Sequence, residues 1–591
     1  MGVKMLQDAD YIVGHNILGF DIPAIQKIFP DFHKPWNQVI DTLPLARVTW
    51  PDIKNGDFAR AQKGRMPGRL IGWHSLEAYG YRLGLLKGDF AKNTDWQEWS
   101  PAMSDYCEQD VLVSIELFKK LLDKKVPPQC AALETQVFWI IGRQERQGIH
   151  FNHEEATALY CKLLARREDL LEQIHQSFPP FYKRNGKEFT PKRDMRKRAG
   201  EWVGYVAGCK CQKIHLVDFN PGSSDHISRW LIRKYGWYPT EFTKKEAPSD
   251  ELRYYMDANG IRSKTTPVVN DEILKSLPYE EAPLLAEFQM VQKRIGQLAE
   301  GKQAWLKHCN EDTGKIHGAV NTNGAVTGRM THFNPNLGQV PASYSEYGPE
   351  MRALFYVLAG RKLVGCDADG LEARCLAHFM ARYDKGAYIK VILEGKKAEG
   401  TDVHSLNAKA LGCSRTTAKT FFYAFMYGGG NVKLGSILIS DEAYSHVHPS
   451  EAGKLGGKMR KKFLKAFPAL AKLTKAVQKA VKERGYLRGL DGRRLPSRSA
   501  HSALNLLLQS AGALIMKKAL CIADEKLTEA NLDYEFVLNV HDEFQVDAAE
   551  SDAETVARIC EQAITEAGEH FNFRCPLSGS ADIGVTWAET H

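Results

Sequence analysis

The most informative segment of this chain is KLVGCDADGLEARCLAHFM, which runs from Lys362 to Met380. Its apolar start predicts a short strand that ends at Asp367, followed by a glycine turn and a helix from about Leu371. A carboxylate at a strand end is held rigidly and still reaches solvent, which suits a metal ligand. An Asp at a strand–helix turn is also a common helix cap, and this segment alone leaves both interpretations open.

A second segment, YEFVLNVHDEFQVDA from Tyr534 to Ala548, predicts two strands joined by a tight turn at His541, Asp542 and Glu543. By composition alone, an acidic turn of this kind is most simply a solvated loop. Together with Asp367 it has a second interpretation, because two carboxylates on separate strands can bridge a pair of Mg²⁺ ions that retain phosphates as partners. The backbone carbonyl of Ala368 is a candidate further ligand.

A third segment, RTTAKTFFYAFMYGGG, predicts a helix that begins at Arg415 and ends at the glycines 428–430. Arg415, Lys419, Tyr423 and Tyr427 recur every four residues, so they share one broad face about 18 Å long. The order of two cations and two aromatic rings matches a nucleoside triphosphate, whose phosphates attract Arg and Lys and whose base stacks on a ring. The alternative is a basic surface helix with partly buried tyrosines.

Composition restricts the class of protein. The chain has 591 residues, of which 43% are hydrophobic and 25% charged, so we expect several globular domains and exclude disorder. The 12 scattered cysteines indicate a reducing compartment, and the spacing of Cys209, Cys211 and His215 is poor for zinc. We expect no membrane-spanning segment and no signal peptide. The net charge of +8 permits an anionic partner without demonstrating one.

The N-terminal part, residues 1–124, has an α/β pattern. We expect a strand at 11–15, a helix at 21–28, and a later helix with Val111, Ile115 and Phe118 on one face. Residues 130–180 predict long amphipathic helices, and residues 390–485 predict basic helices with a buried stripe. That stripe consists of Leu470, Leu473, Val477 and Val481.

A basic arm interrupts the helices of the second part of the chain. Between Lys183 and Lys213, ten Lys or Arg residues face three acidic residues. A solvated surface loop and a segment that binds DNA or a partner are equally consistent with this composition.

These segments resemble the signature motifs of A-family DNA polymerases, and in particular the replicative enzymes of T-seven-type short-tailed bacteriophages. The resemblance rests on GLEARCLAHFMARYD, AKTFFYAFMYGGG, NGAVTGRMTHFNPNLGQVP, GLDGRRLPSRSAHSALNLLLQSAGALI and VHDEFQV, which follow in the same order. It implies a multidomain α/β and α+β fold in which a right-hand polymerase follows an N-terminally truncated, ribonuclease-H-like 3′–5′ exonuclease domain. The implied divisions are exonuclease-like 1–124, thumb 130–315, palm 316–388 and 486–591, and fingers 389–485.

The resemblance also implies site residues. Asp367 and Asp542 would bind two Mg²⁺ ions, for which Mn²⁺ substitutes, with Glu543 beside them as an auxiliary carboxylate. The residues implied for the incoming nucleotide are Arg415, Lys419 and His404 at the triphosphate, Tyr423 at the sugar and base, Tyr427 near the templating base, and Glu372 against a ribose 2′-hydroxyl. Those implied for the primer–template are Arg329, Asn505, Gln509 and His541.

Two parts depart from the family pattern. HNILGFD and YCEQD match the second and third exonuclease motifs, with Asp21, Tyr106 and Asp110 as the functional residues, but the first motif should precede Asp21 and is not in this sequence. Without the family, Tyr106 and Asp110 are an ordinary helical pair. We therefore expect weak or no proofreading by this chain. The insertion at about 179–218 lies where related enzymes recruit thioredoxin and is shorter than theirs.

We accordingly expect a primer-extending DNA polymerase in the cytoplasm of an infected bacterium. The alternatives are a catalytically silent nucleic-acid-binding replication protein and a single-subunit RNA polymerase. Glu372 and the exonuclease-like start argue against the RNA polymerase, and the retained Asp367, Asp542, Arg415 and Lys419 argue against the silent protein.

Overall fold

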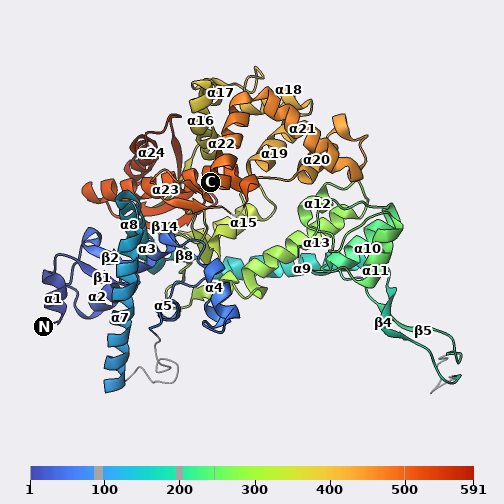
Figure 1. Cartoon of the computed structure of the whole chain (residues 1–591), viewed down its shortest axis with the longest axis horizontal. Helices are drawn as coiled ribbons and strands as arrows, with labels where there is room; N and C mark the ends of the chain where they lie inside the picture. The colour runs from blue at the N-terminus through green and yellow to red at the C-terminus, as the bar shows by residue number, and fades with distance from the viewer. Residues whose placement is uncertain (1, 86–97, 195–203, 245, 498, 591) are drawn as a thin grey trace.

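The structure, a computed structural model, describes residues 2–85, 98–194, 204–244, 246–497 and 499–590 (Figure 1). A central antiparallel sheet has the strand order β14-β15-β11-β16. Its strands are β11 (Arg361–Ala368), β14 (Tyr534–Val540), β15 (Glu543–Ala549) and β16 (Gly579–Gly584). The strand predicted to end at Asp367 and the hairpin predicted around residue 542 are therefore both confirmed, and they belong to one sheet.

The central sheet is buried on both faces because alternate side chains of β11 enter two different cores. Val364 and Cys366 pack with the helices α23 (Ala503–Glu529) and α24 (Ala553–His570), whereas Leu363 belongs to the core on the other side. This alternation follows from the two-residue period of a strand. The turn after β11 uses Gly370 with φ of 53°, and α16 (Leu371–Asp384) begins directly after it.

Helix α23 lies in a segment whose apolar character was not expected from the sequence. Residues Ala500–Glu529 are long and apolar enough to cross a membrane by length and composition, although no such segment was predicted. The most apolar window of this segment is 78% buried inside the protein. A helix that is apolar all round and covered by protein is typical of a domain core.

A helical lobe, residues 387–484, projects above the central sheet (Figure 1). The predicted stripe of Leu470, Leu473, Val477 and Val481 is buried, as expected. Helices pack closely where Gly456 lies, because a Cβ there would come within 1.9 Å of the carbonyl oxygen of Asn431. The lobe consists of α17 (Ala387–Glu394), α18 (Val403–Leu411), α19 (Arg415–Met426), α20 (Asn431–Ile439), α21 (Ala452–Ala466) and α22 (Pro468–Arg484).

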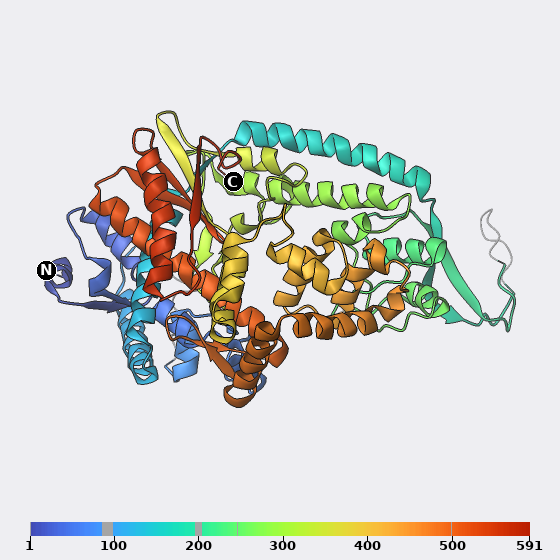
Figure 2. The same cartoon turned by 90° about the horizontal axis from the view of Figure 1, so that it is seen from above.

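A second helical unit lies beside the lobe and carries a long β-ribbon. The basic arm forms this ribbon, which pairs β4 (Phe181–Phe189) with β5 (Cys211–Val217) and extends far from the body (Figures 1 and 2). Residues 195–203 of the arm lie outside the described residues. The helices are α9 (His153–Ser177), α10 (Ser224–Tyr235), α11 (Asp250–Ala258), α12 (Asp271–Lys275), α13 (Ala282–Ile295) and α14 (Trp305–His308).

Short strands join this unit to the central sheet. They form a four-stranded sheet of order β10-β3-β7-β6 and a separate pair, β8 with β9. Their bounds are β3 (Ile149–Phe151), β6 (Cys309–Asn310), β7 (Lys315–Ile316), β8 (Ala319–Asn321), β9 (Thr331–Phe333) and β10 (Phe355–Tyr356).

The N-terminal unit contains the parallel pair β1 (Ile12–Gly14) and β2 (Val39–Asp41). The predicted strand at 11–15 and the predicted helix at 21–28 are confirmed by β1 and by α2 (Asp21–Ile28). The other helices of this unit are α1 (Gly2–Asp8), α3 (Thr42–Thr49), α4 (Lys54–Gln62), α5 (Leu76–Leu83) and α7 (Pro101–Lys124). The next helix, α8 (Pro128–Gln147), packs against α3 of this unit and against β14 and α23 of the central core.

The predicted apolar face of α7 is wrong. Val111 and Ile115 are 57% and 44% exposed, and the buried face consists of Val113, Leu117 and Leu121. Apolar residues occur on both sides of this helix, so local spacing does not determine which side packs.

Candidate active site

The end of β11 and the turn between β14 and β15 bring Asp367 and Asp542 together. Asp367 pairs with Glu543 in the β11–β15 register, and the backbone N–H of Ala368 donates to the carbonyl oxygen of Asp542 at 3.1 Å. His541 reverses the chain at the tip with φ of 56°, in the left-handed region. The two aspartates, distant in sequence, are thus held by one antiparallel ladder, as the sequence predicted.

The surroundings of Asp542 suit a bound cation. Its side chain is 31% exposed, and it forms an ion pair with Arg329, whose Nη2 lies 4.0 Å from Oδ1. Burial raises the pKa of Asp542, while Arg329 and His541 act to lower it. A positive ion at the carboxylate would stabilise its charged form further.

The donor set fits a hard divalent ion. Asp367 is half-buried beside Asp542, and both offer carboxylate oxygens, the ligands that Mg²⁺ prefers. Within the described ranges, no group of three or more His, Cys, Asp or Glu side chains is placed to hold a metal ion. Two carboxylates leave coordination positions for water and substrate phosphates, which is the usual condition of Mg²⁺ in phosphoryl-transfer sites.

Glu543 lies opposite Asp367, as expected, but its side chain is part of the core. It is 4% exposed, and its Oε1 accepts hydrogen bonds from Trp587 Nε1 at 2.6 Å and Gln545 Nε2 at 2.5 Å. These contacts tie the turn to the C-terminal segment. The carboxylate thus has a structural function that the sequence did not reveal.

The predicted face of α19 gathers cations and rings. Lys419 is exposed and Tyr423 half-buried, and the rings of His404 and Tyr423 lie 5.9 Å apart. Burial lowers the pKa of His404, and Arg415 and Lys419 lower it further, so the ring is neutral at pH 7. Arg415, Lys419, His404 and Tyr423 therefore form one cationic and aromatic surface.

Arg415 is not free in this structure. Its Nη2 lies 2.7 Å from Asp402 Oδ2, and its Nε donates to Oδ1 at 3.4 Å. Asp402 also accepts the backbone N–H of His404, so it caps α18 and holds α19 at once. The hydrogen bond from Arg415 keeps the pKa of Asp402 well below its ordinary range.

Glu372 connects the α19 face to the aspartate pair. It accepts a hydrogen bond from the hydroxyl of Tyr427, and its Oε1 lies 3.5 Å from Arg329 Nη2. Arg329 in turn approaches Asp542. A continuous row of side chains therefore runs from α19 through Glu372 and Arg329 to the carboxylates.

Two further predicted residues lie on the partly exposed side of α23. Asn505 and Gln509 are one turn apart and half-buried. Ala513, one turn further, lines a small pocket together with Arg329, His541 and Asp542. The exposed side of α23 thus leads directly toward the carboxylate pair.

The candidates in the N-terminal unit come from two helices. Asp21 is exposed at the start of α2, and Tyr106 and Asp110 are half-buried on α7. Tyr106 and Asp110 are four residues apart on α7 and share one side of that helix, and the proximity of Asp21 to them stays a prediction.

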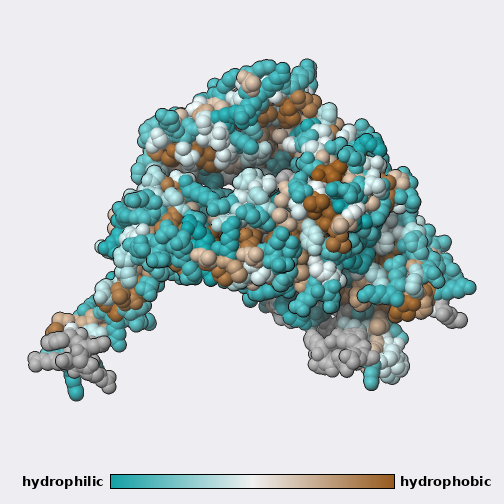
Figure 3. Space-filling view, turned by 180° about the vertical axis from the view of Figure 1, so that it is seen from behind, coloured by the Kyte–Doolittle hydropathy of each residue, from teal (hydrophilic) through white to brown (hydrophobic). Residues whose placement is uncertain are grey.

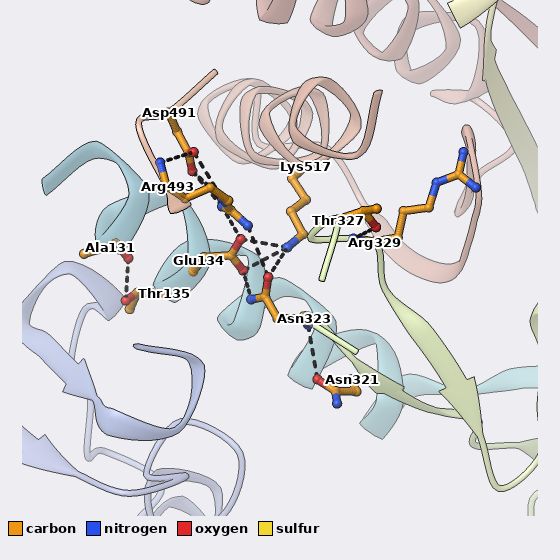
Figure 4. Close-up of polar contacts among 10 residues, drawn as sticks. All are labelled: Ala131, Glu134, Thr135, Asn321, Asn323, Thr327, Arg329, Asp491, Arg493 and Lys517. Carbon is orange, nitrogen blue, oxygen red and sulfur yellow. Dashed lines mark hydrogen bonds and ion pairs between the residues drawn. The ribbon is translucent and has the colours of Figure 1, made fainter. Parts of the chain in front are cut away.

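Sequence reasoning missed a buried ion cluster, made of Glu134, Asp491, Arg493 and Lys517 (Figure 4). These side chains are at most 3% exposed. One signal for it exists, because Glu134 and Lys517 are lone charges on otherwise apolar helical faces. Such charges are rarely buried unless they are paired.

Known DNA polymerases are similar to this chain over nearly its whole length. The sequence model described as DNA polymerase family A matches residues 209–589. The DNA-directed DNA polymerases of Enterobacteria phage T3 and Escherichia phage T7 are each 36% identical over 688 residues, covering 98% of this chain and 92% of the relative. The POL domain of Pol1 from M. smegmatis, solved with a DNA primer-template and dNTP, has a TM-score of 0.65 at 18% identity and covers 94% of this chain and 83% of that one.

Proposed function

This chain belongs to DNA polymerase family A, and we propose that it is a DNA-templated DNA polymerase that extends a primer 3′-end during phage-type DNA replication. The observation that supports this most is the meeting of Asp367 and Asp542 at the end of one ladder. In this assignment the helical unit with the ribbon belongs to the thumb, residues 130–315. The central sheet belongs to the palm, residues 316–388 and 486–591, and the helical lobe forms the fingers, residues 389–485.

The carboxylates Asp367 and Asp542, with the carbonyl of Ala368, would hold two Mg²⁺ ions. Ions held there would supply activation of the attacking hydroxyl and neutralisation of the charge on the leaving pyrophosphate. The protein's own contribution is to fix both carboxylates on rigid strands before the substrate arrives, so that little reorganisation is needed during the reaction.

The incoming nucleotide lies along α19. Arg415 and Lys419 bind the triphosphate with His404, which as a neutral ring donates one hydrogen bond. Tyr423 packs against the sugar and base, and Tyr427 lies near the templating base. Arg415 must first exchange Asp402 for a phosphate, so Asp402 holds this guanidinium in place until the nucleotide enters.

Glu372 excludes ribonucleotides in this proposal. Its carboxylate, fixed by Tyr427 and Arg329, occupies the space that a 2′-hydroxyl needs. Arg329, Asn505, Gln509 and His541 contact the primer–template, because they line the surface from α23 to the carboxylate pair.

Primer extension tests the proposal. The wild-type chain with Mg²⁺ should add deoxynucleotides to a primer and discriminate strongly against ribonucleotides. Asp367→Ala should abolish extension and retain primer–template binding. Extension by Asp367→Ala would contradict the assignment, equal use of ribonucleotides would favour a single-subunit RNA polymerase, and binding without extension by the wild type would favour a silent binding protein.

Proofreading by this chain is absent or weak in our proposal. In the described structure this remnant offers two carboxylates, Asp21 on α2 and Asp110 on α7. The proposal rests on the resemblance, in which further acidic ligands come from a first exonuclease motif. Removal of a mismatched 3′-terminal nucleotide at ordinary rates would refute this.

The ribbon binds a processivity factor, for which thioredoxin is the candidate from the resemblance. Tyr182 and Leu216 face each other in the β4–β5 register and are 64% and 58% exposed, with Ile214 two residues further at 57%. Hydrophobic surface is visible on the otherwise hydrophilic projecting arm (Figure 3). Exposed apolar residues that lie together are typical of a protein-binding surface, while the neighbouring lysines favour the DNA backbone.

We propose that the polymerase acts in the cytoplasm of an infected bacterial host.

A further inference from the structure

The buried ion cluster lies next to the loop 322–330, which joins β8 to β9. Lys517 Nζ is 2.7 and 2.9 Å from the two carboxylate oxygens of Glu134, and Arg493 Nη2 is 2.5 Å from one of them. Arg493 also pairs with Asp491 at 2.6 Å. The cluster therefore links α8, α23 and the turn between β12 (Tyr486–Arg488) and β13 (Arg494–Pro496).

Asn323 attaches the loop to this cluster. Its Oδ1 accepts hydrogen bonds from Arg493 Nη1 and from Lys517 Nζ, each at 3.2 Å, and its Nδ2 donates to Glu134. The side chain uses both its acceptor and its donor inside the protein, where Asn323 is 9% exposed. A buried amide with three charged partners is held in one orientation.

Hydrogen bonds within the rest of the loop converge on the backbone of Arg329. Thr327 Oγ1 accepts the backbone N–H of Arg329 at 3.3 Å, and the N–H of Ala325 donates to the carbonyl oxygen of Arg329, also at 3.3 Å. Gly328 has φ of 83°, and a Cβ there would lie 2.8 Å from Arg493 Nη1. The guanidinium of Arg493 therefore packs directly against the residue before Arg329.

At its far end the loop presents Arg329 to Glu372 and Asp542. Figure 4 shows the side chain of Arg329 extending away from the cluster, while Asn323 and Lys517 point toward one another. The cluster reaches the loop at Asn323 and beside Gly328. Its influence on Arg329 must pass through the backbone of the loop.

We propose that Asn323, fixed by the buried ion cluster, is a positioning residue that sets the place of Arg329 beside Glu372 and Asp542. This rests on the proposed function, in which Arg329 contacts the primer–template. Loss of Asn323 leaves the ion pairs of the cluster intact and frees the loop, so Arg329 spends less time in its working position. The main effect of losing Asn323 is on binding of the primer–template, and the effect on stability is secondary.

A double-mutant cycle between Asn323→Ala and Arg329→Ala tests this. In the wild-type background, Asn323→Ala should lower kcat/KM for primer extension about tenfold, mainly through KM for primer–template. In the Arg329→Ala background the same change should have an effect of less than about twofold, because the residue it positions is gone. Equal effects in both backgrounds, or no effect in the wild type, would overturn the proposal.

Gln136→Ala is the matched control. Gln136 lies on the same helix as Glu134, is 4% exposed, and donates to Glu525 at 2.7 Å, so it also ties α8 to α23 without touching the loop. It should reduce thermal stability and leave kcat/KM unchanged. A tenfold fall in kcat/KM for this control would mean that any loosening of α8 impairs extension, and would overturn the specific role of Asn323.

Thr327→Val provides a second cycle if Asn323→Ala does not fold. It removes only the hydroxyl that accepts the Arg329 N–H and should show the same dependence on Arg329. Additive effects here would overturn the proposal equally. The Asp367→Ala variant keeps the two questions separate: if it extends primers, the proposed function fails, and if it is inactive while both cycles are additive, only the positioning inference fails.

Discussion

Glu134→Gln should destabilise the protein severely, because it removes the negative charge at the centre of the buried ion cluster. Glu134 is fully buried and faces Lys517 at 2.7 Å and Arg493 at 2.5 Å. At an effective dielectric constant of about 20, each charge pair near 3 Å contributes about 5 kcal/mol of attraction, most of which offsets the cost of desolvation. The variant retains both cations, whose side chains are 1% and 3% exposed.

The free energy of unfolding of Glu134→Gln should be about 3–5 kcal/mol lower than that of the wild type, as for other buried ion pairs that lose one partner. For a unit of this size, the melting temperature should fall by about 10 °C. Differential scanning calorimetry and hydrogen exchange of the α8 amides measure the change. Gln136→Ala, which loses one neutral-to-charged hydrogen bond, should lose about 1–2 kcal/mol. A Glu134→Gln variant no less stable than Gln136→Ala would refute the reasoning.

The same cluster predicts a pH dependence. Burial opposes ionisation of Glu134, but Lys517 and Arg493 hold its pKa below the ordinary value of 4.5. A depressed carboxyl pKa stabilises the folded state above the unfolded value, and this contribution is lost as pH falls through the folded value. The stability difference between wild type and Glu134→Gln should therefore be full near pH 7 and shrink in acid well below 4.5. A difference that grows in acid would contradict this sign.

Three further predictions concern the site and the ribbon. Asp542→Asn should abolish extension and raise the melting temperature. Burial raises the pKa of Asp542, so its charge is unfavourable in the folded state above the ordinary pKa, and a neutral side chain removes that charge. A lower melting temperature would count against this prediction. Glu543→Gln should lower the melting temperature by weakening the bonds to Trp587 and Gln545, yet reduce kcat far less than Asp542→Asn; equal losses of kcat would give it a catalytic role. Leu216→Asp should shorten the products made in one binding event with thioredoxin and leave those made without it unchanged; shortening in both conditions would implicate DNA binding instead.

Much of the central sheet was predictable because its signals are local. The apolar run before Asp367 and the hairpin around Asp542 follow the two-residue period of strands, and the helical stripe from Leu470 to Val481 follows the period of a helix. That Asp367 and Asp542 lie together was predictable only because two carboxylates at strand ends suit one metal site. The family resemblance then supplied the roles of the remaining residues.

The features that escaped prediction depend on distant partners. Helix α7 has apolar residues on more than one side, and tertiary packing selects Val113 and Leu117 over Val111 and Ile115. Glu134 and Lys517 are far apart in the sequence and pair only in the folded protein, so no local pattern specifies that ion pair. Residues 500–529 resemble a membrane span in composition because protein, and not water, surrounds most of that helix.

The central claim is that Asp367 and Asp542 ligate the same divalent ions, and a change of ligand atom tests it most directly. Asp542→Cys replaces an oxygen ligand with sulfur, which binds Mg²⁺ poorly and softer ions better. Under reducing conditions, extension by this variant should be nearly lost with Mg²⁺ and partly restored by Mn²⁺, raising the ratio of the Mn²⁺ to the Mg²⁺ rate about tenfold above wild type. Glu550→Cys, at the exposed end of the same hairpin, should keep the wild-type ratio. An unchanged ratio in Asp542→Cys, or near-wild-type extension with Mg²⁺, would contradict the account.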